Sequence, residues 1–147
     1  MNYTEVKLIL GKLNLRPKKY LGQNFLIDNS ILEKIIVLSG VSKEDTVLEI
    51  GPGLGALTEP LIKKAKKVYA IEIDSNLYKY LSEKFSIYNN CEIINDDILK
   101  IDIPPHNKVI SNIPYTITGP ILEKLFFNQD PPQGILIIEK NIVNRIF

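Results

Sequence analysis

The sequence predicts one α/β domain built around a mainly parallel, doubly wound sheet. Its length of 147 residues, with 45% apolar side chains, supplies one ordinary core and leaves no room for a second. Short apolar runs bounded by Gly, Pro, Asn or Asp are typical of buried strands, and amphipathic helical patterns separate them. Strand alternating with helix indicates a parallel sheet with ligand sites at the carboxyl ends of its strands. The apolar runs are residues 47–50, 68–73, 91–94, 109–110 and 135–138.

Helices are predicted from apolar spacing and from their end signals. Ser30 with Glu33 three residues later forms a capping box, and Gly40 supplies a stop, so we expect a helix over residues 30–39. Other amphipathic patterns predict further helices. These patterns are Val6-Ile9-Leu10-Leu13, Leu57-Leu61-Ile62-Ala65, Leu77-Tyr80-Leu81 and Ile121-Leu122-Leu125-Phe126.

Composition narrows the class of protein. The net charge of +1 is too small to indicate nucleic-acid binding by an overall field, and the lysines of residues 63–67 suit a solvated helix end. The single cysteine, Cys91, excludes an internal disulfide and favours a reducing cytoplasm. No stretch approaches membrane-spanning length, and the lone His106 lies far from other ligand-type clusters. We therefore expect a cytoplasmic, monomeric protein without a membrane segment or a metal site.

A glycine-rich turn follows the first predicted strand. Gly51, Gly53 and Gly55 let the backbone turn tightly and approach a ligand, and the next helix offers free N–H groups. Glu72 ends the second strand roughly 20 residues after Gly51. A carboxylate at this place would accept hydrogen bonds from both hydroxyl groups of a nucleoside ribose. The alternative is a solvated charge at a strand end. Asp97, just past the third strand, would accept a hydrogen bond from an adenine amine, whereas the neighbouring Asp96 and Asp102 equally suit turn positions. These features predict an adenosine-containing cofactor without separating NAD from S-adenosylmethionine.

The tetrapeptide Asn112-Ile113-Pro114-Tyr115 stands where the fourth strand should end. The exocyclic amine of adenine is a poor nucleophile because its lone pair is delocalised. The side-chain oxygen of Asn112 and a backbone carbonyl near Pro114 would hold both amine protons and aim the lone pair at a sulfonium methyl. Pro114 stiffens the loop, and Tyr115 offers a face for an extruded base. The alternative is a loop N-cap followed by a core tyrosine. With the glycine turn and Glu72, the motif predicts methyl transfer from S-adenosylmethionine to a nucleobase amine.

From about Arg16 to Ile138 the chain resembles the ribosomal RNA adenine dimethyltransferase family. Residues 21–28, Leu-Gly-Gln-Asn-Phe-Leu-Ile-Asp, are similar to the first signature of that family. By themselves they indicate only a glycine-led loop with a capping Asp28. The resemblance implies that Phe25 lies near the transferring methyl group. It also implies a set of cofactor contacts, which are Gln23, Asn24, Leu26, Gly51, Gly53, Glu72, Asp97 and Asn112.

The resemblance implies a Rossmann-like fold of the class I methyltransferase type, with S-adenosylmethionine as cofactor. The reaction would place two methyl groups on N6 of each of two adjacent adenosines near the 3′ end of small-subunit RNA, in the immature small subunit. Residues 1–28 would form an N-terminal helix and cofactor-contacting loop, and residues 29–147 the methyltransferase domain. The family continues into two further strands and a helical domain that are absent here. An apolar fifth strand so near the chain end also indicates a fragment or a covered edge.

Other functions stay open at this point. Macrolide-resistance methyltransferases of the large subunit share Gln-Asn-Phe-Leu and Asn-Ile-Pro-Tyr, but they usually carry a lysine where Leu54 stands and lack the Leu-Gly before Gln23. Glu139 and Asn141 depart from the usual glutamine and glutamate of the small-subunit family, whereas Arg145 agrees. A non-catalytic RNA-binding factor in ribosome assembly or transcription is a further alternative. A nicotinamide oxidoreductase is disfavoured because no motif-borne Tyr-Lys pair is evident.

Overall fold

The computed structural model describes residues 3–15, 28–113 and 115–138. Its 5-stranded sheet has the order β3-β2-β1-β4-β5, and all neighbouring strands are parallel. The strands are β1 (Thr46–Ile50), β2 (Lys67–Glu72), β3 (Cys91–Asn95), β4 (Lys108–Asn112) and β5 (Gln133–Ile137). The predicted doubly wound parallel sheet is thus confirmed. Its strand order reverses between β1 and β4, where such folds bind ligands.

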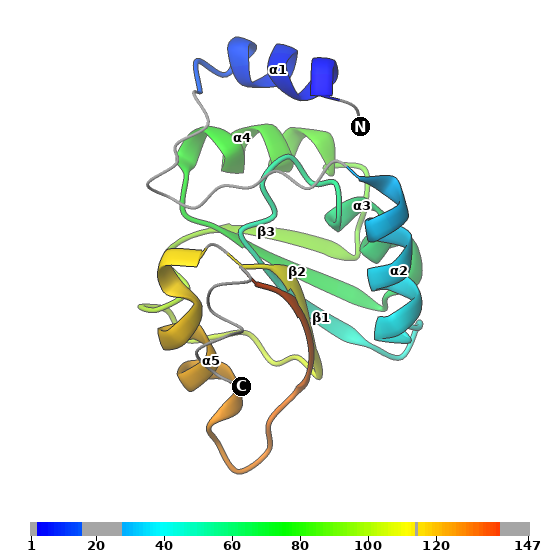
Figure 1. The fold of residues 1–147 in the computed structure, drawn as a ribbon, viewed down its shortest axis with the longest axis vertical. Helices are drawn as coiled ribbons and strands as arrows, with labels where there is room; N and C mark the ends of the chain where they lie inside the picture. Colours follow the sequence, from blue (N-terminus) through cyan, green and yellow to red (C-terminus); the bar gives the residue numbers. More distant parts are fainter. Residues whose placement is uncertain (1–2, 16–27, 114, 139–147) are drawn as a thin grey trace.

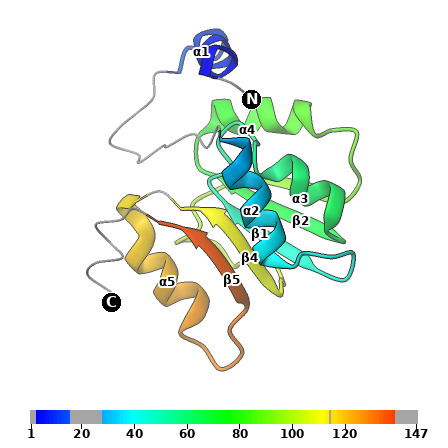
Figure 2. The same cartoon turned by 45° about the vertical axis from the view of Figure 1, so that its right-hand side comes forward.

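Helices cover both faces of the sheet. Helices α2, α3 and α4 pack on one face and α5 packs on the other, as Figure 1 and Figure 2 show from two sides. The helices are α1 (Tyr3–Lys12), α2 (Asn29–Ser39), α3 (Thr58–Lys64), α4 (Ser75–Lys84), the 3-10 turn η2 (Tyr115–Ile117) and α5 (Thr118–Phe126).

The start of α2 differs from the predicted capping box. The Ser30 N–H donates to Asp28 Oδ1 at 2.9 Å, so the partner that Glu33 would have used is already taken. The cap on Asp28 that the sequence indicates is confirmed, and the box of Ser30 with Glu33 is wrong. The stop at Gly40 is also confirmed, because its φ of 56° is left-handed and its N–H donates to Val37 O.

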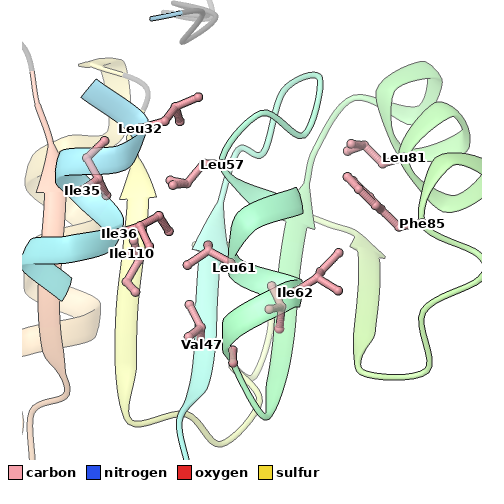
Figure 3. Packing of buried hydrophobic residues seen from close by; sticks show 12 residues of the cluster. Leu32, Ile35, Ile36, Val47, Leu57, Leu61, Ile62, Leu81, Phe85 and Ile110 are labelled. Atoms are coloured by element: carbon pink, nitrogen blue, oxygen red, sulfur yellow. The ribbon is translucent and has the colours of Figure 1, made fainter. Parts of the chain in front are cut away.

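Alternating side chains of the central strands fill two cores. Val47 belongs to the core under α2 and α3, whereas the next residue, Leu48, belongs to the core under α5, and both are fully buried. Figure 3 shows side chains of α2 and α3 gathered over Val47 and Ile110. This burial on both faces explains why the strands are continuously apolar.

The two outer strands are less buried than their composition predicts. In β5, Gln133 and Gly134 are exposed and residues 135–137 are half-buried, and β3 has no fully buried residue. Pairing places β5 at the edge of the described sheet, which is the position that the expectation of a fragment or a covered edge assumes. Cys91 lies in β3 as a half-buried residue, as predicted for a small strand residue.

The N-terminal amphipathic helix packs against α4 and the glycine turn that follows β1. Val6 and Leu10 of α1 form a small buried cluster with Leu77 of α4 and with Leu54 of the glycine turn. In Figure 1, α1 lies over α4 at the top of the molecule. The packing of α1 therefore buries one side of the glycine turn.

Candidate functional site

The glycine turn leaves the carboxyl end of β1 in a backbone shape that requires glycine. Gly51, Gly53 and Gly55 have φ values of 63°, 60° and 80°, all in the left-handed region. At Gly55 there is also no space, since a Cβ would lie 2.6 Å from the Phe85 ring. The Gly51 N–H donates to Ile71 O at 2.9 Å, which fastens the turn to β2.

Glu72, at the end of β2, lies against this turn. Its side chain is buried, and it accepts a hydrogen bond from the backbone N–H of Asp74 at 2.9 Å, while the backbone N–H groups of Gly53 and Ile73 also favour its charged form. Burial nevertheless raises the pKa of Glu72 to about 7, because these N–H groups offset only part of the desolvation. A carboxylate in this position can accept further hydrogen bonds from a neutral diol at little added desolvation cost. Glu72 thus lies at the same sheet edge as the glycine turn, and its contact with a ribose stays a prediction.

Glu49 is a buried carboxyl group that the sequence reasoning missed. It lies in β1 beneath the glycine turn, with 2% of its surface exposed. Burial raises the pKa of Glu49 to about 8; the Thr58 hydroxyl acts in the opposite direction, and the charge of Glu72 adds to the rise. Neither Glu49 Oε2 nor Thr58 Oγ1 makes a hydrogen bond of good geometry to another described group. Its signal in the sequence is a charge inside an otherwise apolar strand.

Ile73 was also missed, although it directly follows Glu72. Its side chain is 58% exposed, unusual for an isoleucine at the end of a buried strand. Asn95 Nδ2 donates to Glu72 O at 2.8 Å and so fixes the backbone that carries both residues. An exposed apolar side chain next to the Glu72 carboxylate offers a surface for a flat ring.

Asp97 serves the turn that follows β3. Its Oδ1 accepts the Leu99 N–H at 2.9 Å, and its Oδ2 is 4.0 Å from Lys100 Nζ. Lys124 of α5 donates to Ile98 O at 2.8 Å and to Ile101 O at 2.7 Å. One oxygen of Asp97 thus serves the turn, and the loop that carries it is fastened to α5.

Asn112 closes β4 at the same edge of the sheet as the glycine turn and Glu72. It pairs in register with Ile137 of β5, and the following Ile113 N–H donates to Ile137 O at 3.1 Å. Tyr115 begins η2, which leads directly into α5. Because β1 and β4 are neighbours, Asn112 and the glycine turn face each other across the point where the strand order reverses.

Several predicted site residues lie outside the described residues. They are Gln23, Asn24, Phe25, Leu26 and Pro114, together with Glu139, Asn141 and Arg145. Among the described residues, no helix is long and apolar enough to cross a membrane. Over the same ranges, no group of three or more His, Cys, Asp or Glu side chains could hold a metal ion. His106 lies in the loop before β4, as expected, with Nδ1 2.7 Å from Pro104 O.

Comparison with known proteins decides the family. The model of the family described as ribosomal RNA adenine dimethylase matches residues 14–147. The chain belongs to this family. A curated ribosomal RNA small subunit methyltransferase A from Clostridium botulinum is 44% identical over 147 residues, covering 95% of this chain and 54% of the relative. A probable small subunit methyltransferase A from Thermococcus gammatolerans is 45% identical over 94% of this chain and 49% of its own. The chain thus spans about half the length of these curated relatives.

Solved structures agree on the fold. A dimethyladenosine transferase from Plasmodium falciparum matches with a TM-score of 0.77 and 34% identity, covering 84% of this chain and 46% of that protein. The 23S rRNA methyltransferase ErmE matches almost as well, with a TM-score of 0.76 and 32% identity over 82% of this chain and 50% of its own. The predicted methyltransferase-type Rossmann-like fold is confirmed. Backbone similarity alone does not separate the two kinds of enzyme.

Proposed function

We propose that this chain is the cofactor-binding and base-binding part of an S-adenosylmethionine-dependent RNA adenine N6-dimethyltransferase that acts on the small ribosomal subunit. One observation carries the proposal. The buried Glu72 carboxylate lies against the glycine turn, where the Gly53 N–H favours its charged form, at the sheet edge where β4 ends in Asn112.

The described residues fit an adenosine-containing cofactor. Glu72 would accept hydrogen bonds from both ribose hydroxyls, and Ile73 would pack against the adenine ring. Asp97 would accept a hydrogen bond from the adenine amine. The backbone of the glycine turn admits close approach of a ligand because no Cβ intervenes. When bound, S-adenosylmethionine supplies an electrophilic methyl group on a sulfonium centre. Residues 23–26, by family resemblance, would cover that end of the cofactor.

The target base would be held by the tetrapeptide that follows β4. Asn112 Oδ1 and a carbonyl near Pro114 would each accept one hydrogen bond from the adenine N6 amine. This arrangement weakens the conjugation of the nitrogen lone pair with the ring. Tyr115 would stack on the extruded base, a contact worth roughly 1 to 3 kcal/mol. These roles amount to orientation and electrostatics, and they require no strongly basic side chain.

The small subunit is the favoured target because of Leu54. Large-subunit enzymes of this kind usually carry a lysine at that place in the glycine turn. Here Leu54 is 3% exposed and packs with Val6, Leu10 and Leu77. A lysine ammonium in that cluster would be desolvated without a partner, so the packing of α1 fits leucine. The curated relatives named for the small subunit support the same choice.

The test is transfer of a labelled methyl group to immature small subunits, with large subunits assayed in parallel. We expect Asn112→Ala to lower transfer at least about 100-fold, because a group that acts in the transition state is lost. Calorimetry with the unaltered chain should show binding of S-adenosylmethionine and no binding of NADH. Asn90→Ala is the matched control, since Asn90 Nδ2 only ties Ile62 O and Ala65 O of the α3 region.

Three outcomes would contradict the proposal. Labelling of the large subunit alone would favour the macrolide-resistance type of enzyme. Cofactor binding without transfer to either subunit would favour the non-catalytic RNA-binding factor. Binding of NADH in place of S-adenosylmethionine would remove the methyltransferase assignment altogether.

A further inference from the structure

The pair of strands β1 and β4 carries a side-chain bridge where its ladder should continue. Register pairing covers Val47↔Lys108 and Leu48↔Val109 in the described strands. Two residues further on, the Ile50 N–H donates to Ser111 Oγ at 3.1 Å, and Ser111 Oγ donates to Ile50 O at 2.6 Å. Ser111 is 1% exposed, so water does not compete for these bonds.

In a regular parallel ladder, both backbone groups of a residue such as Ile50 bond to the backbone of the neighbouring strand. Here one hydroxyl group occupies both positions. A side chain inserted between two backbones keeps the strands from closing to the regular spacing of about 4.8 Å. The bridge therefore holds β1 and β4 apart at their carboxyl ends.

This interruption is confined to the point where the strand order reverses. On its other side, β1 stays paired with β2 through Ile50↔Ile71. Likewise β4 stays paired with β5 through Asn112↔Ile137. The bridge thus lies between two intact ladders, at the mouth of the candidate site.

The residues that follow the bridge are those of the proposed site. Ile50 precedes Gly51, the first glycine of the turn, and Ser111 precedes Asn112. We propose that Ser111 is a positioning residue whose hydroxyl sets the separation of the glycine turn from Asn112, and so aligns the cofactor with the target amine. This inference rests on the proposed function and adds to it a residue that touches neither ligand.

A purely structural hydroxyl is available as a matched control. Ser39, at the end of α2, is also buried, and its Oγ donates to Ile36 O at 2.8 Å. It lies by the amino ends of the strands, where Lys108 of β4 bonds to its carbonyl oxygen. Ser39→Ala removes a buried hydroxyl as Ser111→Ala does, but far from the glycine turn.

The experiment compares Ser111→Ala, Ser111→Thr and Ser39→Ala with the unaltered chain. Methyl transfer at saturating substrate gives kcat, and calorimetry with S-adenosylhomocysteine gives cofactor affinity. We expect Ser111→Ala to lower kcat at least about tenfold and to change affinity less than about threefold, because each ligand keeps its own contacts. Threonine keeps the hydroxyl and should restore most of the rate, and Ser39→Ala should leave both quantities unchanged.

Amide exchange measured by NMR tests the bridge without reference to activity. In Ser111→Ala, the Ile50 amide should exchange at least about tenfold faster, and the Gly51 and Asn112 resonances should shift, whereas Ser39→Ala should change none of them. An unchanged kcat in Ser111→Ala, or unmoved Gly51 and Asn112 resonances, would overturn the inference. If the unaltered chain transfers no methyl group, the proposed function fails, and the resonances still decide whether Ser111 sets this spacing.

Discussion

Buried carboxyl groups lie at both ends of the sheet, and their pKa values are shifted in opposite directions at the two ends. At the amino ends, Asp45 accepts from Ser42 N–H at 2.8 Å and from Asn107 Nδ2 at 2.7 Å, and pairs with Lys108 Nζ at 3.2 Å. Burial raises the pKa of Asp45, but these partners outweigh it, so the pKa lies below its ordinary value. At the carboxyl ends, burial dominates and raises the pKa of Glu72 and of Glu49.

The partners at the amino ends are themselves satisfied. Lys108 Nζ also donates to Ser39 O at 2.9 Å and to Gly40 O at 3.1 Å, and Asn107 Oδ1 accepts the Thr46 N–H at 2.7 Å. Such a network joins α2, β1 and β4. Breaking a buried ion pair whose hydrogen bonds are all made is strongly destabilising. A buried carboxyl group with unused hydrogen-bonding capacity lowers stability, and such groups are common where a ligand supplies the missing partner. With the proposed function, stability and binding are divided between the two ends of one sheet.

The largest effect is expected from Asp45→Ala, which breaks the hydrogen-bonded network at the amino ends of the strands. It leaves the Lys108 charge buried with only carbonyl partners, so the free energy of unfolding should fall by about 3–5 kcal/mol. Urea denaturation measures this. Glu59→Ala is the control, because it breaks an exposed pair with Lys63 and should cost less than about 1 kcal/mol. Cofactor affinity of folded Asp45→Ala should be unchanged, and a clear loss would refute the division between the two ends.

The next largest effect is expected from Glu72→Gln at the carboxyl ends of the strands. Losing charge-assisted hydrogen bonds should weaken S-adenosylmethionine binding by roughly 1.5–3 kcal/mol, with no loss of stability. In the unaltered protein, affinity should fall as pH drops through the pKa of about 7, since a protonated carboxyl group cannot accept from both hydroxyls. Calorimetry across that range should give a flat profile for Glu72→Gln. Exposed Glu44→Gln should keep the profile of the unaltered protein, and a flat profile there would count against Glu72.

The smallest effect near pH 5 is expected from Glu49→Gln, and this effect grows as pH rises. Because the folded pKa of about 8 exceeds the ordinary 4.5, the folded state keeps a proton that the unfolded state releases. Stability therefore falls as pH rises through this window, and glutamine removes that dependence. Thermal unfolding should give similar midpoints near pH 5, with the variant the more stable of the two proteins above pH 8. Equal pH dependence in both proteins would show that Glu49 is ionised in the fold.

Much of the candidate site was predictable because its signals are local. A glycine with left-handed φ, an acid at a strand end and Asn112 before a proline are each visible within a few residues. The order of strands and helices then places them at one edge. Glu49 and Ser111 gave no comparable signal. A glutamate in an apolar strand and a serine before Asn112 acquire their meaning from Thr58 and Ile50, which are distant in sequence.

The amino-acid pattern alone therefore specified the elements, the parallel sheet and the residues at its carboxyl edge, since periodicity and turn chemistry act over short distances. Three-dimensional packing specified the remainder. It placed β5 at the edge, saturated Asp45 while leaving Glu49 Oε2 without a hydrogen bond of good geometry, and inserted Ser111 between β1 and β4. Burial and hydrogen bonding between distant segments depend on which segments meet, and that is settled only when the chain is folded.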